Sequence, residues 1–577
     1  MKHPTFPSNR LRIWPIALVA VCFLGAALNL SAAYRETIGY NRLVTELQLR
    51  GLPVPTGAGL RVTQVEAPAN EAGDYRPNPS NAEFTGISFH LQSGTSGNSN
   101  HATTAGQVMY GSATSMAYGI SDVDVYQTND WISGKGYGGI NPMVDNNPLQ
   151  NHSWVGTGPD TISRSLDFAA ERDGFLAVVG MPNSSTDIVA VPTVYAQTYN
   201  TLSVGLSNGN HKSGLTTSDG TGRIKPEIVG VNSATSFATP QVTAAAALLI
   251  EAAGTNTNAR HQLSLKAILL AAADKSSFAA WSRTPTQPID THFGAGRLDV
   301  YESYWIQQAG QQGHGAGAIG PRGWDFSTIS GIPRNYSLSV PDGFRLEDVS
   351  VLLTWNRSID VVGRGPTRSF SVTTYNLNLT LRDNDANVVD ESTSDVQNIE
   401  HLWISGNDVL EAGNYTLEVF QTSSGTNVPY ALAWRGRLVQ DFELWAETVF
   451  PAGTDAADMT PAADPDGDGV VNLMEYALGT DPLSPSTADL PTPLRLTIGD
   501  DQFLALSYPR PPHDNGVTYT VETSEDLQSW SSAPGDVVAV SITPHPDGVR
   551  EIHTYRRAVP ITAEDRGFLR LRVDGDF

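Results

Sequence analysis

Short apolar runs that are typical of strands alternate with helical segments between Leu60 and Tyr304. Runs such as GLRVTQVEA, FLAVVGM and TLSVGL fit buried strands, whereas LSLKAILLAAA and TPQVTAAAALLIEAA fit helices. Strands that are separated by helices pair in parallel, because each helix crosses over a face of the sheet. We therefore expect an α/β domain over residues 60–306, with a mostly parallel sheet and helices on both faces.

The chain has 577 residues, which is more than one hydrophobic core holds, so further domains are expected. The Gly- and Gln-rich residues 307–324 are typical of a linker. Residues 325–440 alternate polar and apolar side chains, as in SVLLTW and NLNLTLRD, which indicates a β-sandwich. An acidic, Pro-rich region follows over 450–487. Short strands return over 490–577, where we expect a C-terminal β domain.

The N-terminus has basic residues, an apolar stretch and the small residues SAA that end at Ala33, which is the three-part form of a secretory signal. We expect residues 1–33 to direct export to the periplasm, the cell surface or the medium, which leaves a short arm over 34–59. The alternative is an uncleaved membrane anchor, because the apolar run approaches the roughly 20 residues that a span requires. The only cysteine, Cys22, lies in this segment, so the exported chain has no disulfide.

Sixty acidic residues stand against 36 basic ones, which gives a formal charge of −24. Such a surface repels nucleic acid and anionic membranes, and it suits the binding of hard cations. We therefore exclude nucleic acid as a partner, expect membrane contact only through an uncleaved signal segment, and expect a monomer.

Ser236 lies among small residues in NSATSFATP, directly before an Ala-rich helical run. A serine in this place can simply cap the helix, and Pro240 fits the first helical position. A nucleophile needs the same features, because a substrate carbonyl must approach closely and a helix N-terminus favours developing negative charge. His101, in NSNHATTAGQ, precedes another expected helix and is a candidate base.

The stretches HATTAG and ATSFATP resemble the histidine and serine motifs of the subtilisin-like serine proteases. NHSWVG, LAVVGMPNSS, SVGLSNGNHKSG, GRIKPEIV and FGAGRLDV resemble further blocks of that family and come in its chain order. The resemblance implies a subtilisin-like fold and hydrolysis of peptide bonds in protein or peptide substrates, without a cofactor for catalysis. It also implies that Ser236 is the nucleophile, His101 the base and Asn183 an oxyanion donor, and that Ser153 and Trp154 bind substrate.

The acid of this family is an aspartate at the end of the first strand, whereas Glu66 occupies the matching position here. A glutamate offers the same carboxylate on a side chain that is one methylene longer, so it can orient His101. Asp74, Asp122 and Asp124 are alternative acids. A Ser-His-Glu triad is the expectation, and its activity depends on how this carboxylate is held.

Three smaller departures from the family concern packing and the oxyanion hole. Ala102 and Thr104 replace a glycine and a histidine, and Pro182 replaces the glycine before Asn183. A proline fixes φ and could shift the asparagine.

Two further functions stay open: a catalytically inactive binding or adhesion protein on the same scaffold, and an esterase that uses the same serine.

The stretch DPDGDGVVNLME, residues 464–475, fits the calcium-loop pattern at every specified position. The expected ligands of a structural calcium ion are Asp464, Asp466, Asp468, the backbone carbonyl of Val470, Asn472 and Glu475. The loop also resembles the dockerin and thrombospondin type 3 calcium repeats. The alternative is an acidic flexible linker.

Two other segments carry expectations. The sandwich stretches YNLNLTLRDNDANVVDES and LEAGNYTLEV resemble bacterial pre-peptidase C-terminal domains, which accompany secreted proteases. The arm and the start of the first strand, from Tyr34 to Val65, have only 32 residues, which is too short for an ordinary folding pro-domain. Either the protease unit folds unaided, or this arm inhibits it by lying in the cleft.

Overall fold

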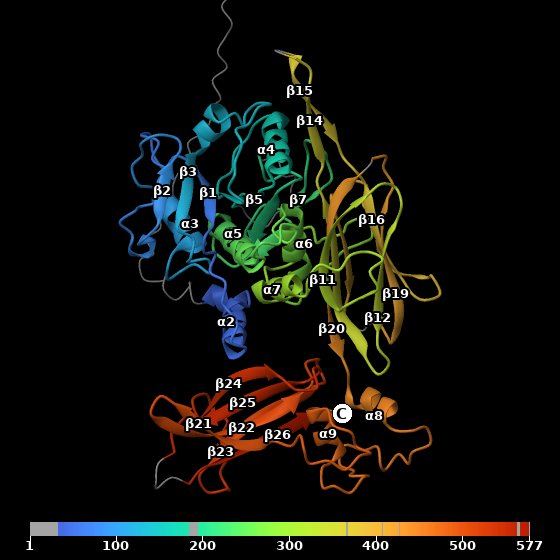
Figure 1. The fold of residues 1–577 in the computed structure, drawn as a ribbon. Coiled ribbons are helices and arrows are strands. Elements are labelled where there is room, and N and C mark those ends of the chain that lie inside the picture. The colour runs from blue at the N-terminus through green and yellow to red at the C-terminus, as the bar shows by residue number, and fades with distance from the viewer. Residues whose placement is uncertain are drawn as a thin grey trace, which may run out of the picture.

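The computed structural model describes residues 33–183, 194–364, 367–406, 408–425, 427–561 and 566–575. Residues 1–32 of the expected signal segment, with Cys22, lie outside these residues. Figure 1 shows an α/β unit in blue to green, a β-sandwich beside it in yellow to orange, and a β module below them in orange to red. Within the described ranges, no helix combines the length and the apolar character that a bilayer crossing requires.

The α/β unit is built on a seven-stranded sheet in the order β2-β3-β1-β4-β5-β6-β9. Every neighbouring pair in this sheet is parallel. Its strands are β1 (Arg61–Glu66), β2 (Ser88–Leu91), β3 (Asp122–Gln127), β4 (Leu149–His152), β5 (Leu176–Gly180), β6 (Leu202–Leu206) and β9 (Ile228–Gly230). Between β6 and β9 in the sequence, the chain forms a separate short antiparallel pair, β7 (Gly214–Leu215) and β8 (Ile224–Lys225). The expected parallel α/β sheet is confirmed.

Helices cover both faces of this sheet (Figure 1). Val62 of β1 shares a core with α3 and α5, whereas Val65 shares a core with α4 on the opposite face. Even-numbered side chains of β1 therefore face α3 and odd-numbered ones face α4, because strand side chains alternate. The helices of this unit are α2 (Tyr40–Leu49), η1 (Ala82–Phe84), α3 (Asn100–Tyr110), η2 (Asp130–Gly134), α4 (Asp160–Asp173), α5 (Thr235–Ala252), α6 (Gln262–Ala272) and α7 (Val300–Gln308).

The start of α5 differs from the sequence expectation. Pro240 lies inside this helix, which begins at Thr235, so Pro240 does not open it. A proline at an interior position costs about 3 kcal/mol, but α5 is buried along most of its length and its packing outweighs that cost. The backbone N–H of Thr235 is also bonded by Asn183 Oδ1 at 2.8 Å. Ser236 therefore lies in the first turn of the helix and not before it.

The arm over 34–59 belongs to the core of the α/β unit. Tyr34, Ile38, Leu43 and Leu47 are buried, and α2 packs against α7. This packing argues against the alternative in which the arm lies in the cleft. Arg50, after α2, forms an ion pair with Glu551 of the C-terminal module at 2.7 Å.

The sandwich consists of a five-stranded and a four-stranded sheet with an apolar core between them. The five-stranded sheet has the order β10 (Ala318–Ile319), β12 (Arg334–Val340), β19 (Gly413–Gln421), β16 (Leu377–Arg382) and β17 (Val388–Ser392). The four-stranded sheet has the order β11 (Arg322–Ile329), β20 (Val428–Val439), β13 (Arg345–Trp355) and β18 (Ile399–Ile404). A hairpin of β14 (Ser358–Val362) and β15 (Ser369–Thr373) projects from it (Figure 1). A β-sandwich after the α/β unit is confirmed.

The sandwich packs directly on the α/β unit. The four-stranded sheet covers α6, and Trp324, Leu352 and Ala433 belong to the core of the α/β unit. Within the stretch 307–324, α7 continues to Gln308 and β10 and β11 have already begun, so only part of the expected linker lacks regular structure.

The C-terminal module begins with α8 (Phe442–Val449) and α9 (Asn472–Leu478). It continues as an antiparallel sheet in the order β21 (Thr492–Ile498), β22 (Asp501–Arg510), β25 (Glu551–Arg557) and β24 (Val537–Pro544). The pair β23 (Val517–Ser524) and β26 (Phe568–Gly575) lies beside it. The acidic loop 464–475 leads into α9.

Candidate active site

Glu66 is the last residue of β1, at the carboxyl edge of the sheet. Its side chain is fully buried, and its Oε2 accepts a hydrogen bond from His101 Nδ1 at 2.7 Å. A carboxylate in this position fixes which imidazole nitrogen carries the proton and leaves Nε2 free to accept another. The structure thus brings together the two residues that the sequence predicts as acid and base.

His101 is the second residue of α3, a helix that Ser99 caps by accepting the N–H of Ala102. The cap fixes the first turn, and the side chain of His101 remains 39% exposed. Burial lowers the pKa of His101, but the charge of Glu66 and its hydrogen bond outweigh burial, so the pKa is raised above its ordinary value. His101 is therefore partly exposed to solvent, and the buried carboxylate of Glu66 balances the charge of its protonated form.

Ser236 lies in the first turn of α5, and the ring of the next residue, Phe237, lies 5.6 Å from the His101 ring between centroids. The Ser236 hydroxyl donates to the Ser153 carbonyl at 3.4 Å. Among the described residues, Ser236 has no hydrogen bond to His101. Such contacts are often long in a protein without substrate and shorten in the complex. The structure thus brings Ser236 and His101, the candidate nucleophile and base, to the same edge of the sheet, without a hydrogen bond between them.

Asn183 follows β5, and its amide orientation is fixed by Thr235. Thr235 donates its N–H to Asn183 Oδ1 at 2.8 Å, and its hydroxyl lies 3.0 Å from the same oxygen. Because an N–H can only donate, the amide oxygen must face Thr235 and the Nδ2 hydrogens must point elsewhere. Asn183 is exposed. An exposed amide donor beside Ser236 is what an oxyanion hole needs.

Ser153 and Trp154 follow β4, the strand next to β1. Ser153 is buried and offers its backbone carbonyl to Ser236. Trp154 is 8% exposed, and its indole N–H donates to His152 Nδ1 at 3.2 Å. Its side chain therefore packs within the unit, and a contact with substrate here would come from the backbone.

The alternative acids have partners of their own. Asp124 bonds Arg61, Asp122 bonds His90, and Asp74 accepts the N–H of Gly97. Within the part of the chain that the structure describes, Glu66 is the carboxylate bonded to His101.

The acidic loop brings three of its expected ligands together. Carboxylate oxygens of Asp464, Asp466 and Asp468 lie within 4.8 Å of one another. Asp464 accepts the N–H groups of Gly467 and Gly469 at 2.9 and 3.0 Å, and both glycines have positive φ. Only glycine adopts that backbone easily, so these two positions let the loop curl around its carboxylates.

Buried oxygens in this loop lack partners. Asp466 Oδ2, Asn472 Oδ1 and Glu475 Oε2 are each buried without a hydrogen bond. Burial, with the charges of Asp466 and Asp468, raises the pKa of Glu475 to about 7. Asn472 Nδ2 donates to the carbonyls of Asp458 and Thr460, so its oxygen faces the other way. These unpaired oxygens fit a hard cation, which takes oxygen ligands.

Val470 is buried, and its N–H donates to Asp468 Oδ1 at 2.8 Å. This bond shapes the loop at the position whose carbonyl is the expected ligand.

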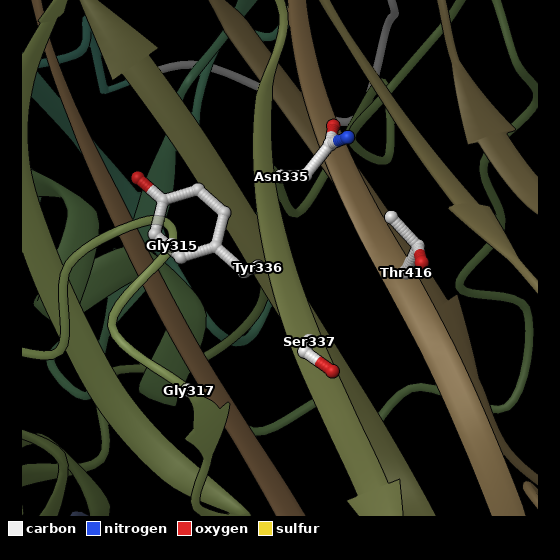
Figure 2. A pocket seen from close by; sticks show the side chains of 6 residues that line it. All are labelled: Gly315, Gly317, Asn335, Tyr336, Ser337 and Thr416. Carbon is white, nitrogen blue, oxygen red and sulfur yellow. The ribbon is translucent and has the colours of Figure 1, made fainter.

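A shallow hollow of about 320 Å³ lies on the sandwich, between the loop of Gly315 and Gly317 and the strands β12 and β19. Figure 2 shows Tyr336 on the side of Gly315, with the other side chains on the opposite side of β12. Its lining has no charged side chain, and it includes none of the triad residues.

Sequence reasoning missed three residues that hold the site: Gln64 and Tyr110 behind Glu66, and Thr235 behind Asn183. A glutamine inside the apolar run LRVTQVEA was the available signal for the first, because an unpaired amide is costly in a strand that is buried on both faces. The partners of Tyr110 and Thr235 lie far away in the sequence, and no local pattern indicates them.

No family model matches this sequence, and a comparison with curated proteins finds no relative. The solved structures that the chain resembles include a cold-adapted subtilisin-like serine proteinase, with 18% identity, 42% of this chain and 88% of that chain covered, and a TM-score of 0.30. The prenylagaramide maturation protease PagA has 17% identity, 46% and 98% coverage and a TM-score of 0.32. For proteases from Pseudoalteromonas arctica, the sequence identity is 16%, 44% of this chain and 91% of that chain are covered, and the TM-score is 0.31.

Proposed function

We propose that the chain is a secreted, subtilisin-like serine endopeptidase that hydrolyses peptide bonds through Ser236, His101 and Glu66. The observation that carries the proposal is the 2.7 Å bond from the half-exposed His101 to the fully buried Glu66, at the edge where Ser236 lies in the first turn of α5. Burying a carboxylate costs free energy even when it is paired, and ionisable pairs that are arranged in this way gather at functional sites.

In the first half of the reaction, neutral His101 takes the Ser236 proton at Nε2 while the serine oxygen attacks the peptide carbonyl carbon. Glu66 accepts a hydrogen bond from Nδ1–H, which stays on the ring, and offsets the positive charge that forms there. Asn183 Nδ2 and the backbone N–H of Ser236 donate to the oxyanion; this N–H lies in the first helical turn, where no carbonyl of the helix reaches it.

His101 then gives its proton to the leaving amine nitrogen, the carbon–nitrogen bond breaks, and an acyl ester remains on Ser236. In the second half, His101 takes a proton from water, and the resulting hydroxide attacks the ester carbon. His101 finally returns that proton to Ser236 as the acid product leaves. Every proton that His101 takes is passed on, so the site ends as it began.

The alternative is a catalytically inactive protein that binds or adheres through this scaffold. The bond from Ser236 to the Ser153 carbonyl, in place of one to His101, is the observation that favours it. Pro182, which fixes the backbone just before Asn183, is a second one.

A fluorophosphonate probe, followed by peptide mapping, tests the proposal on the purified exported chain. We expect a label on Ser236 and none in Ser236→Ala. Glu66→Gln should label far more slowly than the unchanged protein. A folded, calcium-loaded chain that takes no label would contradict the endopeptidase and leave the binding protein as the better account.

We also propose that the loop 464–475 binds a structural calcium ion. The three clustered aspartates and the unpaired Glu475 Oε2 support this proposal. Asp464, Asp466, Asp468, Glu475 and the Val470 carbonyl would hold the ion. Asn472, whose amide nitrogen ties the loop to two carbonyls, would act from behind. The ion would balance the loop's negative charge and stiffen the entry to α9.

Export and the roles of the later parts of the chain are also proposals. The N-terminal segment supports export, and the sandwich resembles domains that accompany secreted proteases, where they hold substrate or assist targeting. The partners that fit are protein or peptide substrates, and the acidic surface disfavours nucleic acid.

A further inference from the structure

A chain of hydrogen bonds lies behind the triad acid. Gln64 is two residues before Glu66 on β1, so both side chains face α3. Its Nε2 donates to Glu66 Oε1 at 2.7 Å and to the Ala102 carbonyl at 3.0 Å. The hydroxyl of Tyr110, at the end of α3, donates to Gln64 Oε1 at 2.5 Å. Gln64, Glu66 and Tyr110 are all fully buried, so bulk water does not compete for these bonds in this structure.

The direction of this chain is fixed by chemistry. The Ala102 carbonyl and the Glu66 carboxylate can only accept, so the amide nitrogen of Gln64 must face them. The amide oxygen then faces Tyr110, whose hydroxyl must donate. The Tyr110 hydroxyl hydrogen and one amide hydrogen of Gln64 therefore point along the chain toward Glu66, and the second amide hydrogen points to the Ala102 carbonyl.

Gly106 leaves room for the outer end of the chain. A Cβ at this position would lie 2.4 Å from the Tyr110 hydroxyl oxygen. Gly106 precedes Tyr110 by four residues on α3, the spacing at which helix side chains are neighbours. A residue with low helix propensity thus stands in the interior of a helix where only its lack of a side chain admits the Tyr110 hydroxyl.

A glutamate needs such support more than an aspartate does. Its longer side chain has one more rotatable bond, so more conformations must be suppressed to hold the carboxylate still. A buried carboxylate oxygen without a donor is also costly. In this site Oε1 has Gln64 and Oε2 has His101, so the carboxylate has both partners in a single orientation.

We propose that Gln64 and Tyr110 are positioning residues that hold Glu66 Oε2 against His101 Nδ1 and so adapt the site to a glutamate acid. The inference rests on the serine endopeptidase proposed above for its catalytic consequence. Gln64 acts on His101 through Glu66, and Tyr110 acts one step further back.

The test is the pKa of His101, measured by NMR on full-length protein labelled with ¹⁵N-histidine and assigned with His101→Gln. In Gln64→Leu the carboxylate loses its second partner and turns, so burial dominates and the His101 pKa should fall by about one unit. Tyr110→Phe removes one oxygen atom and should lower it less. Tyr34→Phe is the matched control, because the Tyr34 hydroxyl is also a buried donor, to the Thr114 carbonyl at 2.7 Å, and it should leave His101 unchanged.

The rate of fluorophosphonate labelling supplies the second readout. Gln64→Leu should slow it about tenfold in the unchanged background and leave it unaltered in Glu66→Gln, because two residues that act through one contact are not additive. A purely structural role would slow both backgrounds equally.

The outcomes separate this inference from the proposed function. An unmoved His101 pKa in folded Gln64→Leu and Tyr110→Phe overturns the positioning role. A wild type that takes no label, with a His101 pKa that still falls in the variants, sinks the endopeptidase and keeps the positioning role. Should Gln64→Leu fail to fold, Tyr110→Phe decides in the same way.

Discussion

Glu66 and Glu475 are both buried carboxylates, and their surroundings are opposite. Glu66 accepts from Gln64 with one oxygen and from His101 with the other. Glu475 has one oxygen near the Thr480 hydroxyl at 3.4 Å, and its second oxygen is buried without a partner beside Asp466 and Asp468. The first site is completed by the protein's own donors. The second would be completed by the proposed cation, and this difference separates a proposed catalytic carboxylate from a proposed ligand.

The largest expected effect is that of Glu66→Gln on catalysis. The amide keeps the size of the side chain but loses the charge that orients and balances His101, and the loss of the acid typically costs about 10⁴ in turnover. Fluorophosphonate labelling of Ser236 measures it. Glu475→Gln is the matched control and should label like the wild type in calcium. Equal rates in the two variants would mean that Glu66 does not act on His101.

Calcium should stabilise the C-terminal module by a smaller amount. A ligand that binds only the folded state contributes about 2.7 kcal/mol when its free concentration is about 100 times its Kd. Thermal unfolding with and without a chelator measures this gain, which Glu475→Gln should largely lose. Glu66→Gln, the reverse control, should keep it. A calcium shift of equal size in both variants would place the ion elsewhere.

Asn472→Ala should lower the free energy of unfolding by somewhat less than the loss of calcium does. This loss should also be seen when no calcium is present. Asn472 Nδ2 bonds the carbonyls of Asp458 and Thr460, and the loss of an ordinary hydrogen bond costs about 0.5–1.5 kcal/mol. Chemical unfolding of the chelated protein measures the loss. Glu475→Gln in the same buffer is the comparison, because it removes a charge and breaks no such tie. An unchanged Asn472→Ala would show that the loop is not held through this amide.

The sequence alone predicts the parallel sheet and the places of both glutamates in the fold. The alternation of strands and helices predicts the parallel sheet, and the end of the first strand places Glu66 where the structure has it. The acidic loop follows from spacing alone, because its ligands lie within twelve residues. Local patterns suffice where the partners are near in sequence.

The same reasoning failed where the partners of a residue lie far away in the sequence. Pro240 suggested a later start for α5, since nothing near Thr235 indicates that Asn183, from another segment, bonds its N–H. The Gly- and Gln-rich stretch 307–324 suggested a linker, although Trp324 is buried against the α/β unit. Both errors come from contacts that outweigh local propensity.

The smallest expected effect concerns pH and sharpens the role of Glu66. Catalysis needs neutral His101, so activity should rise as pH rises through the His101 pKa, which the Glu66 charge holds above its ordinary value. In Glu66→Gln that charge is gone and burial alone acts, so the acid limb of the residual activity should move to lower pH. Labelling rates between pH 5 and 9 measure the limb, with Glu475→Gln as the variant that should not move it. An acid limb at the same pH in Glu66→Gln would mean that the charge of Glu66 does not affect the pKa of His101. The two buried glutamates would then differ in hydrogen bonding without differing in function.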